Sequence, residues 1–400
     1  MSKHKNLSRL ASVASVALSA LALPVAGHAE ETIKVGLLTV DAGPFALYMS
    51  HTQDAAAFAI DYLNAQGGAL GRKYELVNQT YNGTPAGAVA TVGRLSQQNV
   101  AFITGFSSSA TALATGPKLA SFNALLLDPT AQSDELTGKG CQQNYFRFTI
   151  NDSMSINALR ALVKRSGIKS WSLIMPDYAT GHDFAKSFTA LVGELGGSVG
   201  VTVFAPLATT DFGGYISQLA AKPADGLAVV FPGSGGVAFA KQQKQFALFA
   251  RFKTVVSANF TSELVIDAQG DSTVGVLTTL PYSWEMPGER NAAFVKAWEQ
   301  RFKRKPSYAD ADNFQAYELL NAAITKAKST DVTAVRTALS GLKTQTVVGD
   351  VEMRAGDHQL SRAMTVVQVA GAGEGKGVMK MQTIEPAAVV VPPVSAECRM

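Results

Sequence analysis

The feature of this sequence that most restricts its fold is a regular alternation of short apolar runs with longer segments of helical periodicity. The apolar runs predict strands, and the apolar positions that recur every three or four residues predict helices. Strands and helices are predicted, in alternating order, at 32–40, 49–64, 74–80, 84–97, 100–103, 104–122 and 124–127. Strands that alternate with helices over short links are typical of a parallel sheet covered by helices on both faces.

The alternation pauses at 138–147 and then restarts, which predicts a second doubly wound lobe. A chain of 400 residues is long enough for two or more such lobes. Helices are predicted at 153–166, 179–195, 212–221 and 237–248, and strands at 170–175, 199–205, 226–231, 253–256 and 274–279. The fold class predicted from this pattern is therefore α/β, with two lobes.

Later in the chain the pattern changes to helix following helix, at 289–302, 310–328 and 332–339. Strands are predicted at 347–353 and 363–370. The glycine-rich stretch 371–377 lies between strand signals with no helix after it, so it predicts a turn and not a phosphate-binding loop. The late helices either form a third domain or return to pack on the first lobe, and the periodicity alone leaves both open.

The most informative local stretch is 104–115, where an apolar strand passes through a glycine and three serines into an alanine-rich helix. Serine is a favoured helix N-cap, because its side-chain oxygen accepts a bond from the unpaired N–H groups of the first turn. The same turn suits a carboxylate or another small anion. Ser108 and Ser109 therefore either bind an anion or only cap the helix, and this stretch alone favours neither.

The first 29 residues have the pattern of a cleaved secretory signal. Lys3, Lys5 and Arg9 precede an apolar region from Leu10 to Val25, and Gly27-His28-Ala29 offers a site with small residues around the cleavage point. The apolar region is too short for a convincing membrane span, and no second run of spanning length follows. No cysteine lies near the cleavage point, so a lipid anchor is not expected. We predict a soluble periplasmic protein.

The charge balance gives no reason to expect a nucleic-acid partner. The whole chain has 35 Lys and Arg against 31 Asp and Glu, but three of the basic residues lie in the predicted signal. The mature chain therefore carries 32 basic and 31 acidic side chains, and the sequence has no basic stripe or nucleic-acid-binding motif.

The chain has two cysteines, Cys141 and Cys398, both in the mature region. In an exported protein an even number of cysteines favours a disulfide, and two allow only one pairing. The prediction is a Cys141–Cys398 bond that ties the end of the chain to its first third. The alternative is two free thiols.

No catalytic or metal-binding constellation can be assembled from the sequence. His51, His182 and His358 are scattered without metal-ligand spacing. Ser166-Gly167-Ile168-Lys169 matches S-x-x-K by letters, but the chain lacks the K-T-G partner motif. Gly233-Ser234-Gly235 lacks the flanking glycine of a nucleophile elbow, and neither a Walker A nor an H-E-x-x-H sequence is present. We expect no cofactor, no metal and no enzymatic activity.

Several short motifs, in their order and spacing, resemble a known family. They are Gly43-Pro44-Phe45-Ala46-Leu47-Tyr48, Gly105-x-x-Ser108-Ser109, Asp128-Pro129-Thr130-Ala131-Gln132 with Glu135-Leu136-Thr137, Phe146-Arg147, Asp177-Tyr178-Ala179-Thr180-Gly181, Leu195-Gly196-Gly197, Thr210-Asp211-Phe212, Pro306-Ser307-Tyr308 and Asp357-His358-Gln359. Over nearly the whole mature chain, the sequence resembles the periplasmic solute-binding proteins of branched-chain amino-acid ABC importers, typified by the leucine/isoleucine/valine-binding protein.

The resemblance implies a type I periplasmic binding fold, in which two doubly wound lobes are joined by a three-strand hinge and close on a ligand. The crossings between lobes are expected near 149–151, 280–282 and 347–349, and the late helices should return to the first lobe. The implied division is 1–29 signal, 30–150 plus 282–348 lobe 1, 151–281 plus 349–385 lobe 2, and 386–400 a tail that returns to lobe 1. The ligand should lie at the carboxyl ends of the strands.

Carried over position by position, the resemblance implies a set of ligand contacts from both lobes. A ligand carboxylate should meet Ser108, Ser109, the backbone of Thr130 and the side chain of Gln132, with Tyr48 as one wall. The second lobe should contribute Tyr178 or Thr180, Gly233-Ser234 and Asn259. For Tyr48 and Tyr178, ordinary packing at the rim of the cleft is the alternative.

Three departures from the family pattern argue against a standard α-amino acid as the ligand. Gln132 stands where amino-acid binders usually have Thr or Ser, and Thr180 where many have Tyr. Asn259 lies near the position of the acidic residue that binds the ligand's ammonium group, and a buried ammonium without an ion pair is costly. We therefore expect a small organic acid, with aromatic acids among the candidates. If the alignment slips, Glu263 or Asp267 would supply the missing acid and favour an amino acid.

The function predicted from the sequence is that of a monomeric solute-binding component of an ABC importer, which delivers a small carboxylic acid to permease subunits at the inner membrane. The alternatives are a binding protein for branched-chain or other amino acids, a ligand-sensing subunit with the same clamp, and, as the minority interpretation, an enzyme on a related fold.

Overall fold

The computed structural model describes residues 31–43, 46–106, 108–222 and 224–400. The predicted signal segment lies outside these ranges, as do Pro44, Phe45 and Ser107 of the motifs above. Residues Thr32–Met400 form one compact unit. None of the helices in the described part of the chain is long and apolar enough to cross a membrane.

The first sheet is fully parallel and has the strand order β2-β1-β3-β4-β5. Its strands are β1 (Ile33–Thr39), β2 (Tyr74–Thr80), β3 (Phe102–Gly105), β4 (Leu125–Asp128) and β5 (Tyr145–Arg147). Successive side chains alternate between its two faces, as strand geometry requires. Leu125 and Leu127 lie in one core cluster while Leu126 lies in another. The central strands β3 and β4 are therefore buried on both sides, and their sequences are largely apolar for that reason, whereas the edge strand β2 is partly exposed and carries polar residues.

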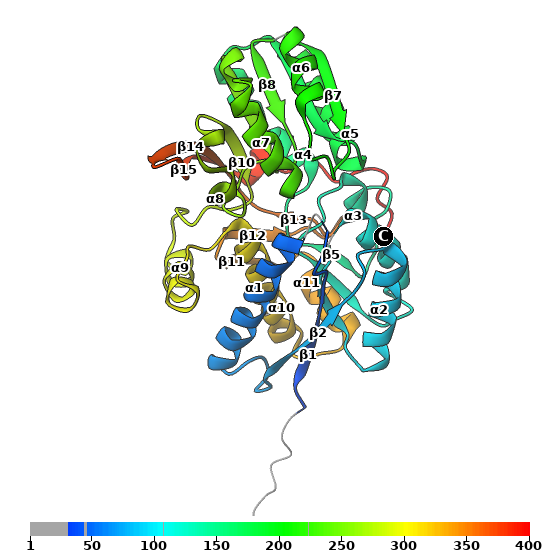
Figure 1. Cartoon of the computed structure of the whole chain (residues 1–400). Helices are drawn as coiled ribbons and strands as arrows, with labels where there is room; N and C mark the ends of the chain where they lie inside the picture. Colours follow the sequence, from blue (N-terminus) through cyan, green and yellow to red (C-terminus); the bar gives the residue numbers. More distant parts are fainter. Residues whose placement is uncertain (1–30, 44–45, 107, 223) are drawn as a thin grey trace, which may run out of the picture. The chain divides into compact units, whose positions relative to one another are not determined.

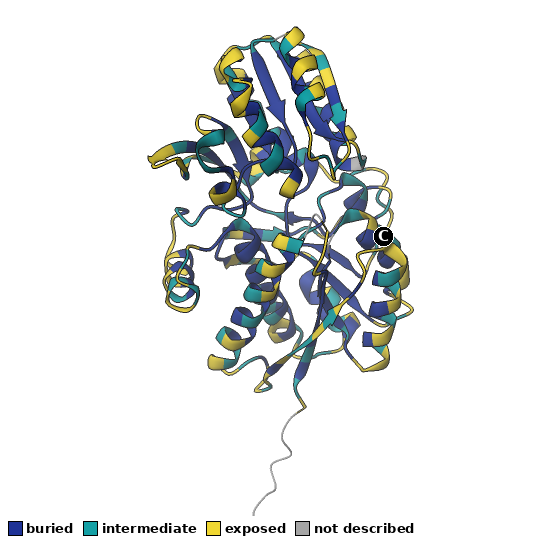
Figure 2. Cartoon of the chain, in the orientation of Figure 1, coloured by how far each residue is buried: buried dark blue, intermediate teal, exposed yellow. Residues whose placement is uncertain are grey.

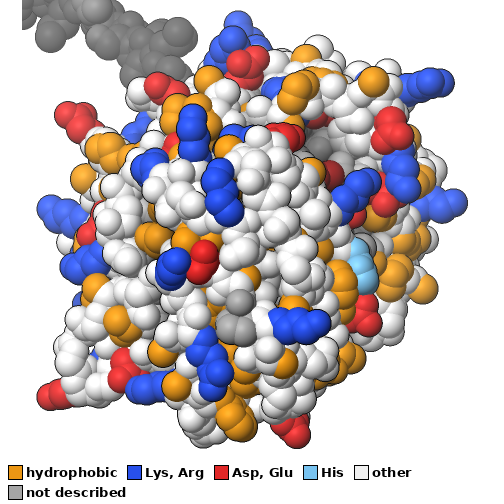
Figure 3. Space-filling model, turned by 90° about the horizontal axis from the view of Figure 1, so that it is seen from above, with side chains coloured by type: hydrophobic (Ala, Val, Ile, Leu, Met, Phe, Trp, Pro, Cys, Tyr) orange, Lys and Arg blue, Asp and Glu red, His pale blue; other side chains and the backbone are white. Residues whose placement is uncertain are grey.

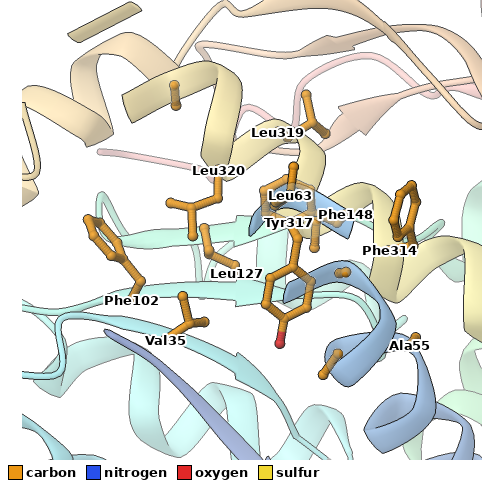
Figure 4. Close-up of a cluster of buried hydrophobic side chains, with 14 of the residues drawn as sticks. Val35, Ala55, Leu63, Phe102, Leu127, Phe148, Phe314, Tyr317, Leu319 and Leu320 are labelled. Carbon is orange, nitrogen blue, oxygen red and sulfur yellow. The ribbon is translucent and has the colours of Figure 1, made fainter. Parts of the chain in front are cut away.

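Helices from two distant parts of the chain cover the first sheet (Figure 1). The early ones are α1 (Ala46–Ala65), α2 (Pro85–Gln97) and α3 (Ser109–Thr115); the late ones are α9 (Glu289–Phe302), α10 (Tyr308–Ala327) and α11 (Val332–Leu339). One apolar cluster joins Val35 and Phe102 of the sheet, Ala55 and Leu63 of α1, and Phe314 of α10 (Figure 4). The late helices thus pack on the first sheet, and they do not form a third domain.

The second sheet has seven strands in the order β15-β14-β10-β9-β8-β6-β7. Its parallel part comprises β6 (Ser170–Pro176), β7 (Ser198–Ala205), β8 (Gly226–Val229), β9 (Thr254–Ala258) and β10 (Leu277–Leu280), and the antiparallel strands β14 (Met364–Gly373) and β15 (Lys376–Glu385) extend it. The helices are α4 (Asp152–Ser166), α5 (Ala179–Glu194), α6 (Gly213–Ala221), α7 (Gly233–Gln245) and α8 (Ile266–Gln269). In Figure 2 the central strands of this sheet are buried and the helices have exposed outer faces, whereas β7 and the tip of the β14–β15 hairpin carry exposed residues.

Two elements of this sheet differ from the sequence prediction. Helix α7 begins at Gly233, four residues before the predicted start, because a run of small residues carries no apolar periodicity. The predicted turn at 371–377 is the tip of the β14–β15 hairpin, where Gly373 and Gly375 have positive φ. Strand β15 is not among the predicted strands, because it lacks a continuous apolar run; its residues alternate between exposed and partly buried positions.

The chain passes between the sheets three times, and all three passages meet at one buried side chain. The passages follow β5, β10 and the small sheet β11-β12-β13 (Lys343–Thr346, Gly349–Met353 and Leu360–Ser361). Arg362 is fully buried, donates to Asp312 of α10, and also bonds the carbonyl oxygens of Phe148 (3.5 Å) and Pro281 (2.6 Å). Thr149 donates to the other oxygen of Asp312 (2.7 Å). A single guanidinium therefore contacts all three passages.

The third passage lies later in the chain than the resemblance implied. Residues 347–349 are the turn of the β11–β12 hairpin, and Gly349 has a φ of 92°. Val351, Met353 and Leu360 belong to the core cluster of the first sheet. The chain thus reaches the second sheet only at Arg362-Ala363, so 349–361 pack with the first sheet and not with the second.

The C-terminal residues contact elements of both sheets. Helix α12 (Ala387–Val390) packs on α4, where Val390 is fully buried and its carbonyl accepts from Asn157 Nδ2 (3.0 Å). Farther along, the Pro392 carbonyl accepts from Arg354, and Cys398 forms a disulfide with Cys141. The predicted Cys141–Cys398 pairing is therefore present.

Candidate ligand-binding site

A cavity of about 130 Å³ lies where the loops at the carboxyl ends of strands from both sheets meet. The loops after β1, β3 and β4 line it from the first sheet, and those after β6, β8, β9 and β10 from the second. In parallel sheets the carboxyl ends of the strands lie at one edge, so residues far apart in sequence converge there.

Eight of the nine predicted ligand contacts line this cavity: Tyr48, Ser108, Ser109, Thr130, Gln132, Tyr178, Thr180 and Asn259. Ser234 does not. It is exposed, and the cavity is lined instead by Pro232 and Gly233, which immediately precede it. Because α7 already begins at Gly233, the backbone turns before Ser234 and the serine lies on the outside of the first helical turn.

The serine turn at the start of α3 forms a capping box. Ser108 has an extended backbone conformation, its Oγ accepts from the Thr111 N–H (3.4 Å), and Thr111 Oγ1 accepts from the Ser108 N–H (3.3 Å). Ser109 Oγ accepts from the backbone N–H of Ser133 (3.1 Å). Both hydroxyls use an acceptor lone pair within the protein, which leaves their O–H groups able to donate towards the cavity.

The loop from Thr130 to Ser133 is held by two buried charged residues. Asp128 Oδ1 accepts from the backbone N–H groups of Thr130 (2.8 Å) and Ala131 (3.0 Å). Burial raises the pKa of Asp128, and these backbone bonds act against that shift. Arg147, which is fully buried, donates to the Ser133 carbonyl (2.6 Å), to Thr137 and to Gln359 (2.6 Å). These bonds fix the loop that presents Thr130 and Gln132.

Tyrosines form the walls. The Tyr48 hydroxyl donates to the Pro129 carbonyl (3.0 Å), and the Tyr48 ring lies 6.0 Å from the ring of Tyr308. Tyr308 is the first residue of α10 and packs against the core clusters of both sheets. The site prediction missed Tyr308, although Pro306-Ser307-Tyr308 was among the family motifs. That motif was the only available signal, because the residue reaches the cavity from 260 positions beyond Tyr48.

A direct hydrogen bond joins the two sides of the cavity. Asn259 Nδ2 donates to Gln132 Oε1 over 2.7 Å. Asn259 follows β9 of the second sheet and Gln132 follows β4 of the first, and Asn259 adopts a left-handed conformation with a φ of 53°. The Gln132 amide keeps its own N–H groups free for a further acceptor.

The cavity wall is uncharged. None of the described residues that line it is Asp, Glu, Lys, Arg or His. Thr130 Oγ1 is buried there without a hydrogen-bond partner. Of the two acids considered as alternatives, Asp267 is exposed on α8, and Glu263 is not part of the lining although its neighbours Ser262 and Leu264 are. The arrangement offers neutral donors and no anion.

The described ranges carry histidine, cysteine and acidic side chains at scattered positions. They contain no group of three or more His, Cys, Asp or Glu side chains placed to hold a metal ion. His51 bonds Asp310, His182 bonds Asp177, and His358 bonds the Tyr145 carbonyl. On the face seen in Figure 3, basic and acidic side chains are interspersed, without a patch of one sign.

A sequence profile described as "Periplasmic binding protein" matches residues 32–375. The chain belongs to the periplasmic binding protein family. Members of this family bind solutes without changing them, so this periplasmic binding protein is not an enzyme. The matched region contains the first sheet, all of the second sheet except β15, and every residue that lines the cavity.

Individual relatives show how far this similarity extends. The Leu/Ile/Val-binding protein homolog 4 of Brucella melitensis is 26% identical over 377 residues, which cover 89% of each chain. The amino acid ABC transporter substrate-binding protein of Pseudomonas fluorescens Pf-5 superposes with a TM-score of 0.84 at 23% identity, covering 93% of this chain and 100% of that one. A solute-binding protein of Rhodopseudomonas palustris BisB5, in complex with 3,4-dihydroxybenzoic acid, superposes with a TM-score of 0.82 at 21% identity. The superposition covers 89% of this chain and 98% of that one. These two structures share the two-lobed type I fold of this binding protein.

Proposed function

We propose that this binding protein is the solute-binding component of an ABC importer and that it takes up a small carboxylic acid, preferably an aromatic one. It would be exported to the periplasm, work as a monomer, hold the solute between its two lobes and deliver it to the permease. Lobe 1 would comprise 30–150 and 282–361, and lobe 2 the remainder up to 385. The observation that carries this proposal is the uncharged, donor-rich wall of the cavity.

An acid is favoured because the cavity gathers donors from several elements. The hydroxyls of Ser108 and Ser109, the unpartnered hydroxyl of Thr130 and the free N–H groups of Gln132 all lie in its wall. A hydrogen bond to a charged group contributes about 1.5–3 kcal/mol. A few such bonds therefore account for micromolar affinity, which corresponds to about −8 kcal/mol.

An α-amino acid is disfavoured because its ammonium group would have no counter-ion. The position expected to carry an acid is Asn259, and its amide already donates to Gln132. A buried charge that lacks a partner costs several kcal/mol. This cost would fall on the ammonium group of an amino acid but would not arise for benzoate, which carries only the carboxylate.

An aromatic body is favoured by size and by shape. A cavity of about 150 Å³ is known to hold benzene, and the cavity here measures about 130 Å³. Tyr48, Tyr178 and Tyr308 surround it, and Leu47 and Val265 add apolar surface. Flat rings pack well against tyrosine walls in offset or edge-to-face arrangements. The similarity in fold to a protein bound to 3,4-dihydroxybenzoic acid is consistent with this choice.

A solute in this cavity would touch both lobes and would therefore stabilise their closed arrangement. Residues after β3 and β4 face residues after β6 and β9 across the cavity. A ligand that contacts both sides binds the closed state better than the open one, and so shifts the population towards it. The permease would then recognise the closed form.

The second candidate function is the binding of a branched-chain amino acid by the same clamp. The Brucella relative, named for leucine, isoleucine and valine, favours it. A signalling role for the closed clamp would use the same site, with a receptor in place of the permease.

A thermal-shift and calorimetric screen with benzoate, 3,4-dihydroxybenzoate and leucine tests the proposal. We expect the two aromatic acids to raise the melting temperature by mass action and leucine to leave it unchanged. An Asn259→Asp variant should lose the acids, because it places a like charge beside the carboxylate, and should gain affinity for leucine. The matched control is Ser234→Asp, which adds the same charge at an exposed position outside the cavity.

Binding of leucine alone by the unmodified protein would overturn the assignment to carboxylic acids and favour the second candidate. Turnover of any of the three compounds would overturn the assignment to transport as a whole.

A further inference from the structure

Glu263 lies directly behind the wall of the cavity. It belongs to the loop between β9 and α8, and its neighbours Ser262, Leu264 and Val265 line the cavity while Glu263 does not. Its carboxyl oxygen Oε2 is completely enclosed and has no hydrogen-bond partner. An enclosed carboxyl oxygen without a partner is rare in folded proteins, because it costs free energy whenever the group is ionised.

The groups that face Glu263 come from segments packed on the first sheet, although Glu263 itself belongs to the second. They are Tyr308 and Asp310 at the start of α10, and Tyr282 and Glu285 in the link after β10. Two of the four are carboxylates. Asp310 itself has partners, because His51 and Arg304 both bond it, and Arg304 also bonds Asp54. No Lys or Arg in the described ranges forms an ion pair with Glu263.

This environment favours the protonated carboxyl group. Burial is the main reason that the pKa of Glu263 rises from 4.5 to about 8. Bonds from the backbone N–H groups of Glu263 and Tyr308 lower this pKa, and the charges of Asp310 and Glu285 raise it. Separation of the two lobes would remove Tyr308 and Asp310 of α10 from the Glu263 side chain and admit water to it. Glu285 would remain, because it accepts from the Met381 N–H of β15 in the second sheet (2.7 Å). In the open form the carboxyl group should then ionise as an ordinary glutamate does.

We propose that Glu263 takes up a proton when the lobes close, so that this protein binds its solute and a proton together. The inference goes beyond solute transport and does not depend on the class of solute, because Glu263 lies outside the cavity lining. Protonation also explains how Oε2 can be enclosed without a partner, because a neutral carboxyl group places no charge in the interior. Removing that charge also benefits an anionic solute in the adjacent cavity.

The direction of the pH dependence follows from which state binds the proton more tightly. The closed form has the higher Glu263 pKa, so closure is favoured at low pH and is weakened as the pH rises through the closed-state value. Between about pH 5 and pH 8 the solute affinity should fall by up to tenfold for each pH unit, and it should level off on either side.

Calorimetry in two buffers of different protonation enthalpy tests the proposal directly. At about pH 7 the dependence of the observed enthalpy on the buffer gives the number of protons taken up, and we expect about one for the unmodified protein and none for Glu263→Gln. The titrant is whichever of benzoate, 3,4-dihydroxybenzoate and leucine raises the melting temperature. Binding of leucine would therefore overturn the proposed solute class and leave this test intact.

The matched control is Glu318→Gln. Burial also raises the pKa of Glu318, to about 7, but its partners Arg290 and Val347 lie in segments packed on the first sheet, so closure should not change its surroundings. Proton uptake should persist in this variant. Uptake that persists in Glu263→Gln, or that is absent from the unmodified protein, would overturn the proposal.

A second measurement covers the case in which none of the three compounds binds. The side chains of Gln132 and Asn259 touch across the cavity. In a Gln132→Cys, Asn259→Cys double variant, a short thiol-reactive linker can join the two positions and hold the lobes closed. Carbon-13 NMR of the Glu263 carboxyl group should then show a raised pKa in the linked protein and an ordinary one in the unlinked protein. Equal values in both would refute the coupling.

Discussion

The cavity and the point where the three passages meet both lie between the two sheets, but the meeting point contains a buried ion pair and the described residues of the cavity wall include no charged side chain. At the meeting point Arg362 and Asp312 are both fully buried and face one another, with Thr149 and the Pro281 carbonyl as further partners. In the cavity wall the polar groups of the described residues are hydroxyls and amides without charge.

The difference reflects what each place has to accommodate. A buried ion pair is tolerable only where its geometry is fixed and further hydrogen bonds hold both partners. At the passages Thr149 and the Pro281 carbonyl supply such bonds, although Arg362 Nε has no partner. A cavity that exchanges a charged solute must remain free of uncompensated charge when that solute leaves. Neutral donors meet this requirement, because they bind an anion and remain hydrated in its absence.

The largest expected effect comes from breaking the charge pair at the passages. Arg362→Met should destabilise the fold by about 3–5 kcal/mol, because it leaves Asp312 as a buried, uncompensated charge. Urea denaturation followed by circular dichroism measures this change. Arg301→Met is the matched control, since Arg301 pairs with Asp61 at the surface and such pairs contribute about 0–1 kcal/mol. Equal losses of stability in the two variants would show that the buried pair contributes no more to folding than the surface pair.

The disulfide should come next. Cys141 and Cys398 are separated by 257 residues, and a bond that closes so long a loop restricts the unfolded chain strongly. Replacing both cysteines by serine should lower stability by about 4 kcal/mol, without changing the solute affinity at the remote cavity. Paired denaturation and calorimetry separate the two effects. A loss of affinity in the double variant would mean that the C-terminal residues influence the cavity.

A titratable group close to the passages should make the fold sensitive to acid. Burial lowers the pKa of His358 from 6.5 to about 4; its ring stacks on Phe146, and its Nδ1–H donates to the Tyr145 carbonyl (3.1 Å). The unfolded chain therefore binds a proton in this range and the folded chain does not. Stability should fall as the pH is lowered from about 6.5 to about 4, by about 3 kcal/mol in total.

Denaturation midpoints of the unmodified protein and of His358→Gln across this pH range measure the effect. The variant is needed because Glu318, whose pKa is raised by burial to about 7, contributes a slope of the opposite sign. His182→Gln, the same substitution at an exposed histidine, provides the control for the loss of an imidazole ring. An identical slope in His358→Gln would exclude His358 as its source.

The smallest effect is expected from single hydroxyls at the cavity. Ser108→Ala should weaken benzoate binding about tenfold, through the loss of one hydrogen bond to a charged group, and should lower stability by about 1 kcal/mol through the lost cap. Ser234→Ala should change neither, because that side chain is exposed and outside the lining. Calorimetric titration of both variants with benzoate measures the two affinities. A loss of affinity in Ser234→Ala alone would show that the exposed serine, and not the helix cap, contacts the solute.

Local patterns predicted the parts of this molecule that depend on local chemistry. The helix that begins at Pro85 and the one that spans Glu289–Phe302 have the predicted limits, because a cap or an apolar periodicity marks each end. Ser108 could be predicted as a helix N-cap because the capping pattern depends on only four consecutive residues. The return of the late helices to the first sheet could not be derived from periodicity, and it came only from the family resemblance.

The misses have physical causes of their own. The strand predicted at 347–353 is divided by Gly349, whose positive φ turns the chain into a hairpin, and this moved the expected third passage too early. Tyr308 was missed as a cavity residue because nothing near it in sequence indicates that it faces Tyr48. Ser234 was misplaced because small residues conceal where α7 begins.

The pairing of α1 with α10 has a consequence for how the polypeptide is made. Phe58 of α1 packs against Trp298 and Phe314, which are synthesised some 240 residues later. Until then one side of the earliest strands and of α1 has no cover, whereas the second sheet can already assemble its parallel part. Nascent chains of this protein should therefore depend on chaperones longest at their beginning, and the half that emerges first should be the last to mature.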